Sequence, residues 1–113
     1  MSSFDPKAFA QAVLSGVTPH VSDVLEEARD LRARLAGLQA DIEGTFGALK
    51  SETDPQRVEN LKLDLEVFMP ARKAAILAAA EAHLSGDVQA ALDRALEVAV
   101  KIALTVAEAF LVA

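Results

Sequence analysis

The residues of this chain best suited to metal chemistry are its two histidines, His20 and His83. If the segments around them form an antiparallel helical hairpin, both imidazoles come to one end of the fold, near three carboxylates: Asp23, Glu81 and Asp87. Two imidazoles and one carboxylate can bind a divalent metal ion. The simpler interpretation is that both histidines lie in terminal helical turns and face water, with His83 favoured by the helix dipole. We therefore predict no metal site and no cofactor.

Other catalytic constellations are missing from the sequence. A dinuclear metal centre in a helical bundle needs Glu-x-x-His pairs, and neither histidine has a glutamate three residues before it. The chain contains no cysteine, which removes disulfides, thiolate metal sites and cysteine nucleophiles. It also has no glycine-rich phosphate loop, nucleophile elbow or zinc motif. We predict that the protein is not an enzyme.

The charge balance argues against a nucleic-acid partner. The formal net charge is −6, whereas nucleic-acid binders present a basic face to the phosphates. The densest group of basic residues is interleaved with acidic ones: Arg29, Arg32 and Arg34 lie among Glu26, Glu27 and Asp30. Such charges stabilise a solvated helix face through pairs three or four residues apart. We predict that the chain does not bind nucleic acid.

Length and composition favour one all-helical domain that spans residues 1–113. Hydrophobic residues make up 52% of the chain but aromatic residues only 4%, so the apolar content is mainly aliphatic and suits helices. The first residues lack the basic and apolar regions of a signal peptide, which predicts a location in the cytoplasm or in an assembled particle. The apolar runs are too short and too often interrupted by charge to predict a transmembrane segment.

Three prolines follow residues that cap helices, and each pair predicts a helix start. The pairs are Asp5-Pro6, Thr18-Pro19 and Asp54-Pro55. The side chains of Asp and Thr accept hydrogen bonds from the first free N–H groups, and proline suits the first helical position. The predicted helices cover residues 6–15, 19–50, 55–84 with a kink at Pro70, and 88–113. Between the last two, Gly86 is expected to be left-handed and Asp87 to cap the final helix.

The predicted fold is a helical bundle of three long helices with a short N-terminal helix. An antiparallel, coiled-coil-like hairpin and an alanine-rich C-terminal helix make up the long helices. The seam of the second helix repeats every three or four residues: Val21, Val24, Ala28, Leu31, Leu35, Leu38, Ile42, Thr45 and Leu49. Its glycines, Gly37, Gly44 and Gly47, either let a neighbouring helix approach closely or end the helix near Gly44.

The final segment, residues 88–113, has more apolar surface than one small chain readily covers. On a helix of 100° per residue, its polar positions occupy a sector roughly 120° wide: Asp93, Arg94, Glu97, Lys101, Thr105 and Glu108. The remaining apolar sector exceeds the stripe of about 100° found on ordinary surface helices. One apolar row is therefore a candidate self-association interface: Val98, Ile102, Val106, Phe110 and Leu111.

These patterns predict a structural or assembly protein that is not an enzyme. We expect it to form a homo-oligomer and to act as a subunit or adaptor of a larger complex, such as a virion, ring or shell. The apolar excess of the last helix is the reason. Two alternatives remain open at this point: binding to a lipid or another apolar surface, and an adaptor that binds a helix of a partner protein.

Overall fold

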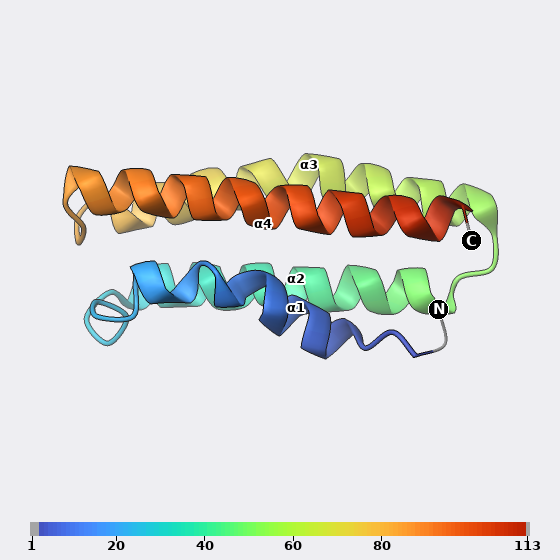
Figure 1. Cartoon of the computed structure of the whole chain (residues 1–113), viewed down its shortest axis with the longest axis horizontal. Helices are drawn as coiled ribbons and strands as arrows, with labels where there is room; N and C mark the ends of the chain where they lie inside the picture. The colour runs from blue at the N-terminus through green and yellow to red at the C-terminus, as the bar shows by residue number, and fades with distance from the viewer. Residues whose placement is uncertain (1–2, 113) are drawn as a thin grey trace.

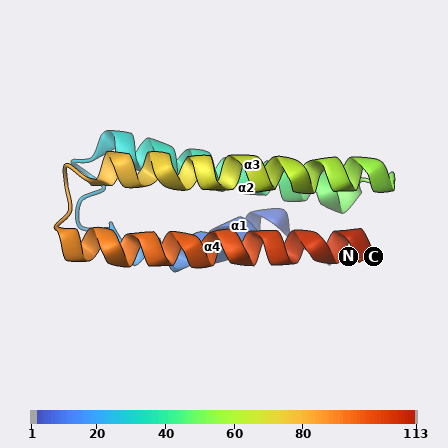
Figure 2. The ribbon, with the colours of Figure 1, turned by 90° about the horizontal axis from the view of Figure 1, so that it is seen from above.

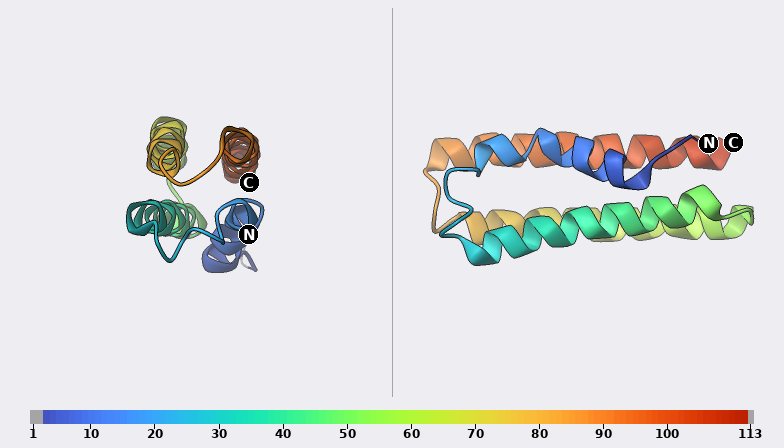
Figure 3. Two further views of the ribbon diagram at one scale, coloured as in Figure 1. Left: turned by 90° about the vertical axis from the view of Figure 1, so that its left-hand side faces the viewer. Right: turned by 90° about the horizontal axis from the view of Figure 1, so that it is seen from below.

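The computed structural model describes residues 3–112 of the chain and folds them into an antiparallel bundle of α-helices (Figures 1 and 2). The elements are α1 (Pro6–Ser15), the short 3-10 helix η1 (Thr18–His20), α2 (Arg29–Ser51), α3 (Pro55–Ala80) and α4 (Gly86–Val112). Viewed along its length, the bundle has α4 beside α3 and α1, with α2 beside both α1 and α3 (Figure 3). This arrangement confirms the predicted helical bundle.

Side-chain caps define two helix starts where the sequence predicts them. The backbone N–H groups of Lys7 and Ala8 donate to Oδ1 of Asp5 at 3.0 and 3.2 Å, and α1 covers the predicted range. At the start of α3, the N–H of Gln56 donates to Oδ1 of Asp54 at 3.0 Å. Both caps precede a proline at the first helical position. Local capping chemistry therefore sets these boundaries without help from distant contacts.

The start of α4 differs from the prediction. The helix begins at Gly86, and no described glycine has a positive φ, so the expected left-handed Gly86 is wrong. The cap is Ser85, whose Oγ accepts from the N–H of Val88 at 3.4 Å. The side chain of Gln89 donates to the carbonyl oxygen of Leu84 at 2.8 Å. Because these two side chains satisfy the turn, a left-handed glycine is not required.

The second helix begins ten residues later than predicted, at Arg29 rather than at Pro19. The residues between η1 and α2 form turns, and the N–H of Ala28 donates to the carbonyl oxygen of Val24 at 2.8 Å. Val21 and Ala28 are nevertheless buried. Since α1 and α2 are antiparallel neighbours, the chain must reverse here while its apolar residues still reach the core. A seam pattern alone cannot distinguish such a turn from a continuous helix.

The glycines of α2 do not end the helix, which continues to Ser51. A Cβ added at Gly37 would lie 3.1 Å from the guanidinium of Arg72 in α3, whereas Gly44 and Gly47 have open space beside them. Of the two alternatives left open by the sequence, close approach therefore holds at Gly37. It lets the side chain of Arg72 pass between the helices.

The core corrects the predicted seam at one position. Phe46 is fully buried, while Thr45, which the seam pattern placed inside, is only half-buried. In α3, Met69 is fully buried and the helix continues through the exposed Pro70. The largest side chains with almost no exposed surface come from all the long helices: Leu31, Leu38, Ile42, Phe46, Leu49, Leu65, Met69, Ile76, Leu92 and Leu96.

A cluster of phenylalanine rings joins three segments at one end of the bundle. Phe4 and Phe9 pack across the start of α1 with ring centroids 5.3 Å apart and ring planes tilted by 49°. The ring of Phe46 lies 4.5 Å from that of Phe9, and the ring of Phe110 lies 5.4 Å from that of Phe4 and 6.0 Å from that of Phe46. The N-terminal segment, α2 and the end of α4 are therefore tied together by aromatic packing.

Candidate self-association surface

The inner face of α4 is covered by the chain itself. Its fully buried side chains follow a spacing of three and four residues: Leu92, Leu96, Ala99, Ala103 and Ala107. Alanine and leucine favour helices, and the small alanine side chains let neighbouring helices come close. Several further apolar residues of α4 are partly buried against the core: Ala95, Val100, Leu104, Val106, Phe110 and Leu111. The uncovered apolar surface is therefore smaller than the sequence suggests.

Two lysines of α3 fix the side of α4 that faces α3. Nζ of Lys73 lies 2.8 Å from Oδ1 of Asp93 and 3.4 Å from Oε1 of Glu97. Lys62 bridges Glu108 of α4 and Glu66 of its own helix in the same way. The carboxylate partners, Asp93 for Lys73 and Glu108 for Lys62, raise the pKa of each lysine above its usual value.

Two of the predicted interface residues lie on the open side of α4. The exposed fraction is 56% for Val98 and 42% for Ile102. They share a shallow depression with Lys101, Thr105 and the half-buried Val106. At 100° per residue, Val98 and Ile102 lie about 100° and 140° around the helix from the carboxylates that face α3. They form what we call the α4 patch, Val98 and Ile102.

Two of the remaining three predicted interface residues, Phe110 and Leu111, lie near the phenylalanine end. Phe110 is half-buried and packs on Phe4 and Phe46. Leu111 is also half-buried and lines a depression beside the connection between α2 and α3. Phe110 therefore has apolar partners within the chain, and the exposed large apolar residues of α4 are Val98 and Ile102.

Cations border the α4 patch. Arg94 precedes Val98 by one helical turn, and Lys101 immediately precedes Ile102. Both cations are exposed, and neither forms an ion pair with another residue between positions 3 and 112. In a chain of net charge −6, two uncompensated cations beside exposed apolar side chains make this surface electrostatically distinct.

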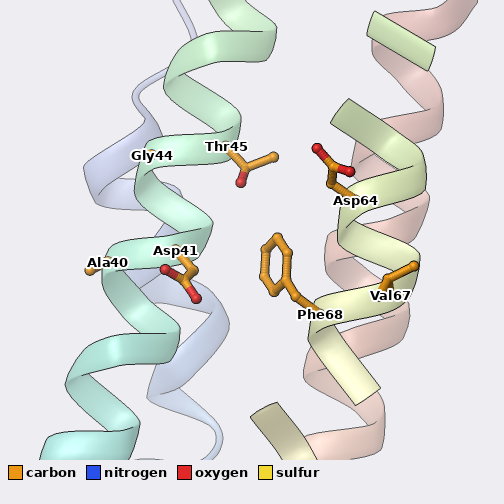
Figure 4. A pocket seen from close by; sticks show the side chains of 7 residues that line it. All are labelled: Ala40, Asp41, Gly44, Thr45, Asp64, Val67 and Phe68. Carbon is orange, nitrogen blue, oxygen red and sulfur yellow. The ribbon is translucent and has the colours of Figure 1, made fainter. Parts of the chain in front are cut away.

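A second exposed apolar pair, Leu63 and Val67 on α3, was not singled out from the sequence. We call it the α3 patch, and its exposed fractions are 48% for Leu63 and 75% for Val67. The apolar residues at seam spacing in this segment are Val58, Leu61, Leu65 and Phe68. Leu63 and Val67 fall outside that row, which is the signal that could have revealed them. Val67 borders a groove of about 570 Å³ between α2 and α3, into which the ring of Phe68 projects from α3 toward Asp41 and Thr45 of α2 (Figure 4).

The two histidines come together, as the sequence predicts. His20 and His83 line one depression of about 380 Å³, together with Asp23 and turn residues from both connections. Glu81 and Asp87 do not line it. Among residues 3–112, no group of three or more histidine and carboxylate side chains is placed to hold a metal ion.

Comparisons with known proteins found no match for this chain. No protein-family model matches it, and neither does any curated protein or solved structure. Within the described part of the chain, no helix combines the length and apolar character needed to cross a bilayer. The α4 patch combines exposed apolar side chains with two bordering cations.

Proposed function

We propose that this protein is a structural subunit that is not an enzyme and that associates with copies of itself through the outer face of α4. The observation that supports this most directly is the exposure of Val98 and Ile102, with fractions of 56% and 42%, on an otherwise well-covered helix. Exposed apolar residues that adjoin one another are typical of interaction sites. The role would be that of a subunit or adaptor in a larger assembly, in the cytoplasm or in an assembled particle.

The size of the patch sets the expected strength of association. Two aliphatic side chains offer a small contact, and small interfaces are typical of weak or transient encounters. We therefore expect association that depends strongly on protein concentration. Many weak contacts repeated through an assembly can still hold it together, because each added contact raises the effective concentration of the next.

Binding to a lipid surface is the main competing function. Interfacial helices carry a lysine-rich polar face and large apolar side chains opposite it. Here Arg94 and Lys101 flank an apolar pair, but the chain is acidic and has no tryptophan. The charge balance therefore favours a protein partner over an anionic membrane.

Size-exclusion chromatography with light scattering over a range of concentrations tests the proposal. The mass should rise with concentration for the natural chain, and Ile102→Glu should hold it at the monomer mass. Ala33→Glu, which adds the same charge at an exposed position of α2, is the matched control and should associate normally. A natural chain that stays monomeric throughout would overturn the proposal.

A second measurement separates self-association from lipid binding. The protein is sedimented with vesicles of phosphatidylcholine alone and with vesicles that also contain phosphatidylserine. We expect it to remain in the supernatant in both cases. A monomeric protein that sediments with the vesicles, and stops doing so in Ile102→Glu, would support the lipid alternative and contradict ours.

A further inference from the structure

The α3 patch has the opposite charge border to the α4 patch. Glu59 precedes Leu63 by one helical turn, Asp64 follows it directly, and Glu66 immediately precedes Val67. All three carboxylates are exposed. Glu59 and Asp64 form no ion pair with another described residue, and Glu66 shares Lys62 at 3.4 Å. The exposed apolar pair on α3 is therefore bordered mainly by acidic groups, and Lys62, which precedes Leu63, is itself paired with Glu66 and Glu108.

The two patches also have the same spacing along their helices. On α3 the order is Glu59, Leu63, Glu66 and Val67, and on α4 it is Arg94, Val98, Lys101 and Ile102. In both, the second apolar residue comes four positions after the first, and the charges stand four before and three after the first. The two patches therefore have the same arrangement of apolar and charged positions along the helix. The charged positions are acidic on α3 and basic on α4.

The patches lie on different sides of the α3–α4 pair. Val67 borders the groove between α3 and α2. The ion pairs of Lys62 and Lys73 with α4 lie on another side of α3. On α4, the patch lies away from the carboxylates that meet those lysines. One copy therefore cannot bring its own two patches together, but two copies can.

We propose that the α4 patch of one copy docks on the α3 patch of a second copy, in antiparallel orientation. This inference rests on the proposed function and names the surface that self-association uses. Antiparallel helices placed face to face bring the same edge of each stripe together. Both charged borders lie on the same edge of their apolar stripes, so this edge brings Glu66 close to Lys101. Glu59 and Arg94 then lie on the same edge at the two ends of the contact.

Charge also argues against contacts between like patches. An α4–α4 contact would bring four uncompensated cations together, and an α3–α3 contact would gather the carboxylates. Like charges across an interface disfavour it, whereas complementary charges fix partner and orientation. A contact between two different surfaces repeats from copy to copy, so it builds a ring if the rotation closes and a filament if it does not.

This arrangement is tested by mixing two variants, neither of which should associate with itself. Ile102→Glu disables the α4 patch, and Val67→Lys disables the α3 patch. Each variant alone should be monomeric by light scattering. An equimolar mixture should form a dimer with one copy of each and nothing larger, because only one pair of functional surfaces remains.

The outcome separates the inference from the proposed function. If Val67→Lys associates like the natural chain while Ile102→Glu does not, self-association stands but the α3 patch is not its partner surface. If the mixture of the two variants stays monomeric although the natural chain associates, the inference is also overturned. Circular dichroism of each variant shows whether the helical fold is kept.

Charge exchange provides a second test that leaves the apolar residues in place. One variant carries Arg94→Glu with Lys101→Glu, and the other carries Glu59→Lys with Glu66→Lys. Each should lose association on its own, because like charges then face each other. Their mixture should recover the mass of the natural assembly. Failure of the mixture to assemble would contradict the pairing of these borders.

Discussion

The two ends of the bundle are built in different ways. At one end, Phe4, Phe9, Phe46 and Phe110 pack their rings together and join the N-terminal segment to α2 and α4. At the other end, the chain forms turns around a depression lined by His20 and His83 among other residues. The first end depends on contacts between distant segments, and the second on local hydrogen bonds. Substitutions at the two ends should therefore have very different effects.

The largest effect is expected at the phenylalanine end. Phe46→Ala removes a fully buried ring that contacts three others, and such changes cost about 3–5 kcal/mol. Phe68→Ala, at a half-buried phenylalanine of the α2–α3 groove, is the control and should cost clearly less. Urea unfolding followed by circular dichroism measures both. Equal losses of unfolding free energy in the two variants would show that the ring cluster contributes no more to stability than a half-buried phenylalanine does.

A smaller effect is expected from the two lysine bridges, one toward each end. Carboxylate partners raise the pKa of Lys62 and of Lys73 in the folded chain above the usual value near 10.5. The contribution of each bridge is therefore fully present below that value and is lost as the pH rises through the raised pKa. Stability should fall above about pH 10.5.

Substitution of each lysine resolves that pH dependence. Lys73→Met and Lys62→Met should each flatten part of the alkaline decrease in the unfolding midpoint, and the double variant should remove more of it. An unchanged profile in the double variant would assign the alkaline loss to other groups.

The smallest effect is expected at the histidine end. His20→Ala and His83→Ala change side chains that form no hydrogen bond or ion pair within the described residues, so each should alter stability by no more than about 0.5 kcal/mol. Isothermal calorimetry with zinc should give no heat of binding. A zinc-dependent rise in melting temperature that disappears in His20→Ala would instead establish a two-histidine site.

Much of the fold could be predicted because its signals are local. Asp5 and Asp54 cap helices through contacts only two or three residues away, so the sequence alone is enough to place those starts. The meeting of His20 and His83 also follows from the order of helices and turns. The late start of α2 at Arg29 could not be predicted in this way, because a reversing chain can keep its apolar residues at helical spacing.

The details of packing were harder to predict. Thr45 has the spacing of the seam, but the side chain that fills the core is that of Phe46 beside it. The ring of Phe46 contacts Phe4, Phe9 and Phe110 and so buries more apolar surface than a threonine side chain would. The seam pattern could not include those partners, which lie far away in the sequence. The α3 patch differs from this case, because Leu63 and Val67 lie outside the seam spacing of their helix. The neighbouring helices then show that this face remains uncovered.

The direction of the helices places both ends of the described chain at the phenylalanine end (Figure 1). A reporter or cargo domain genetically joined to either terminus would therefore project from that pole and leave the long flanks of the bundle clear. Copies carrying different fusions could be combined in one sample without blocking the flanks. The bundle is thus suited to displaying attached domains at one pole.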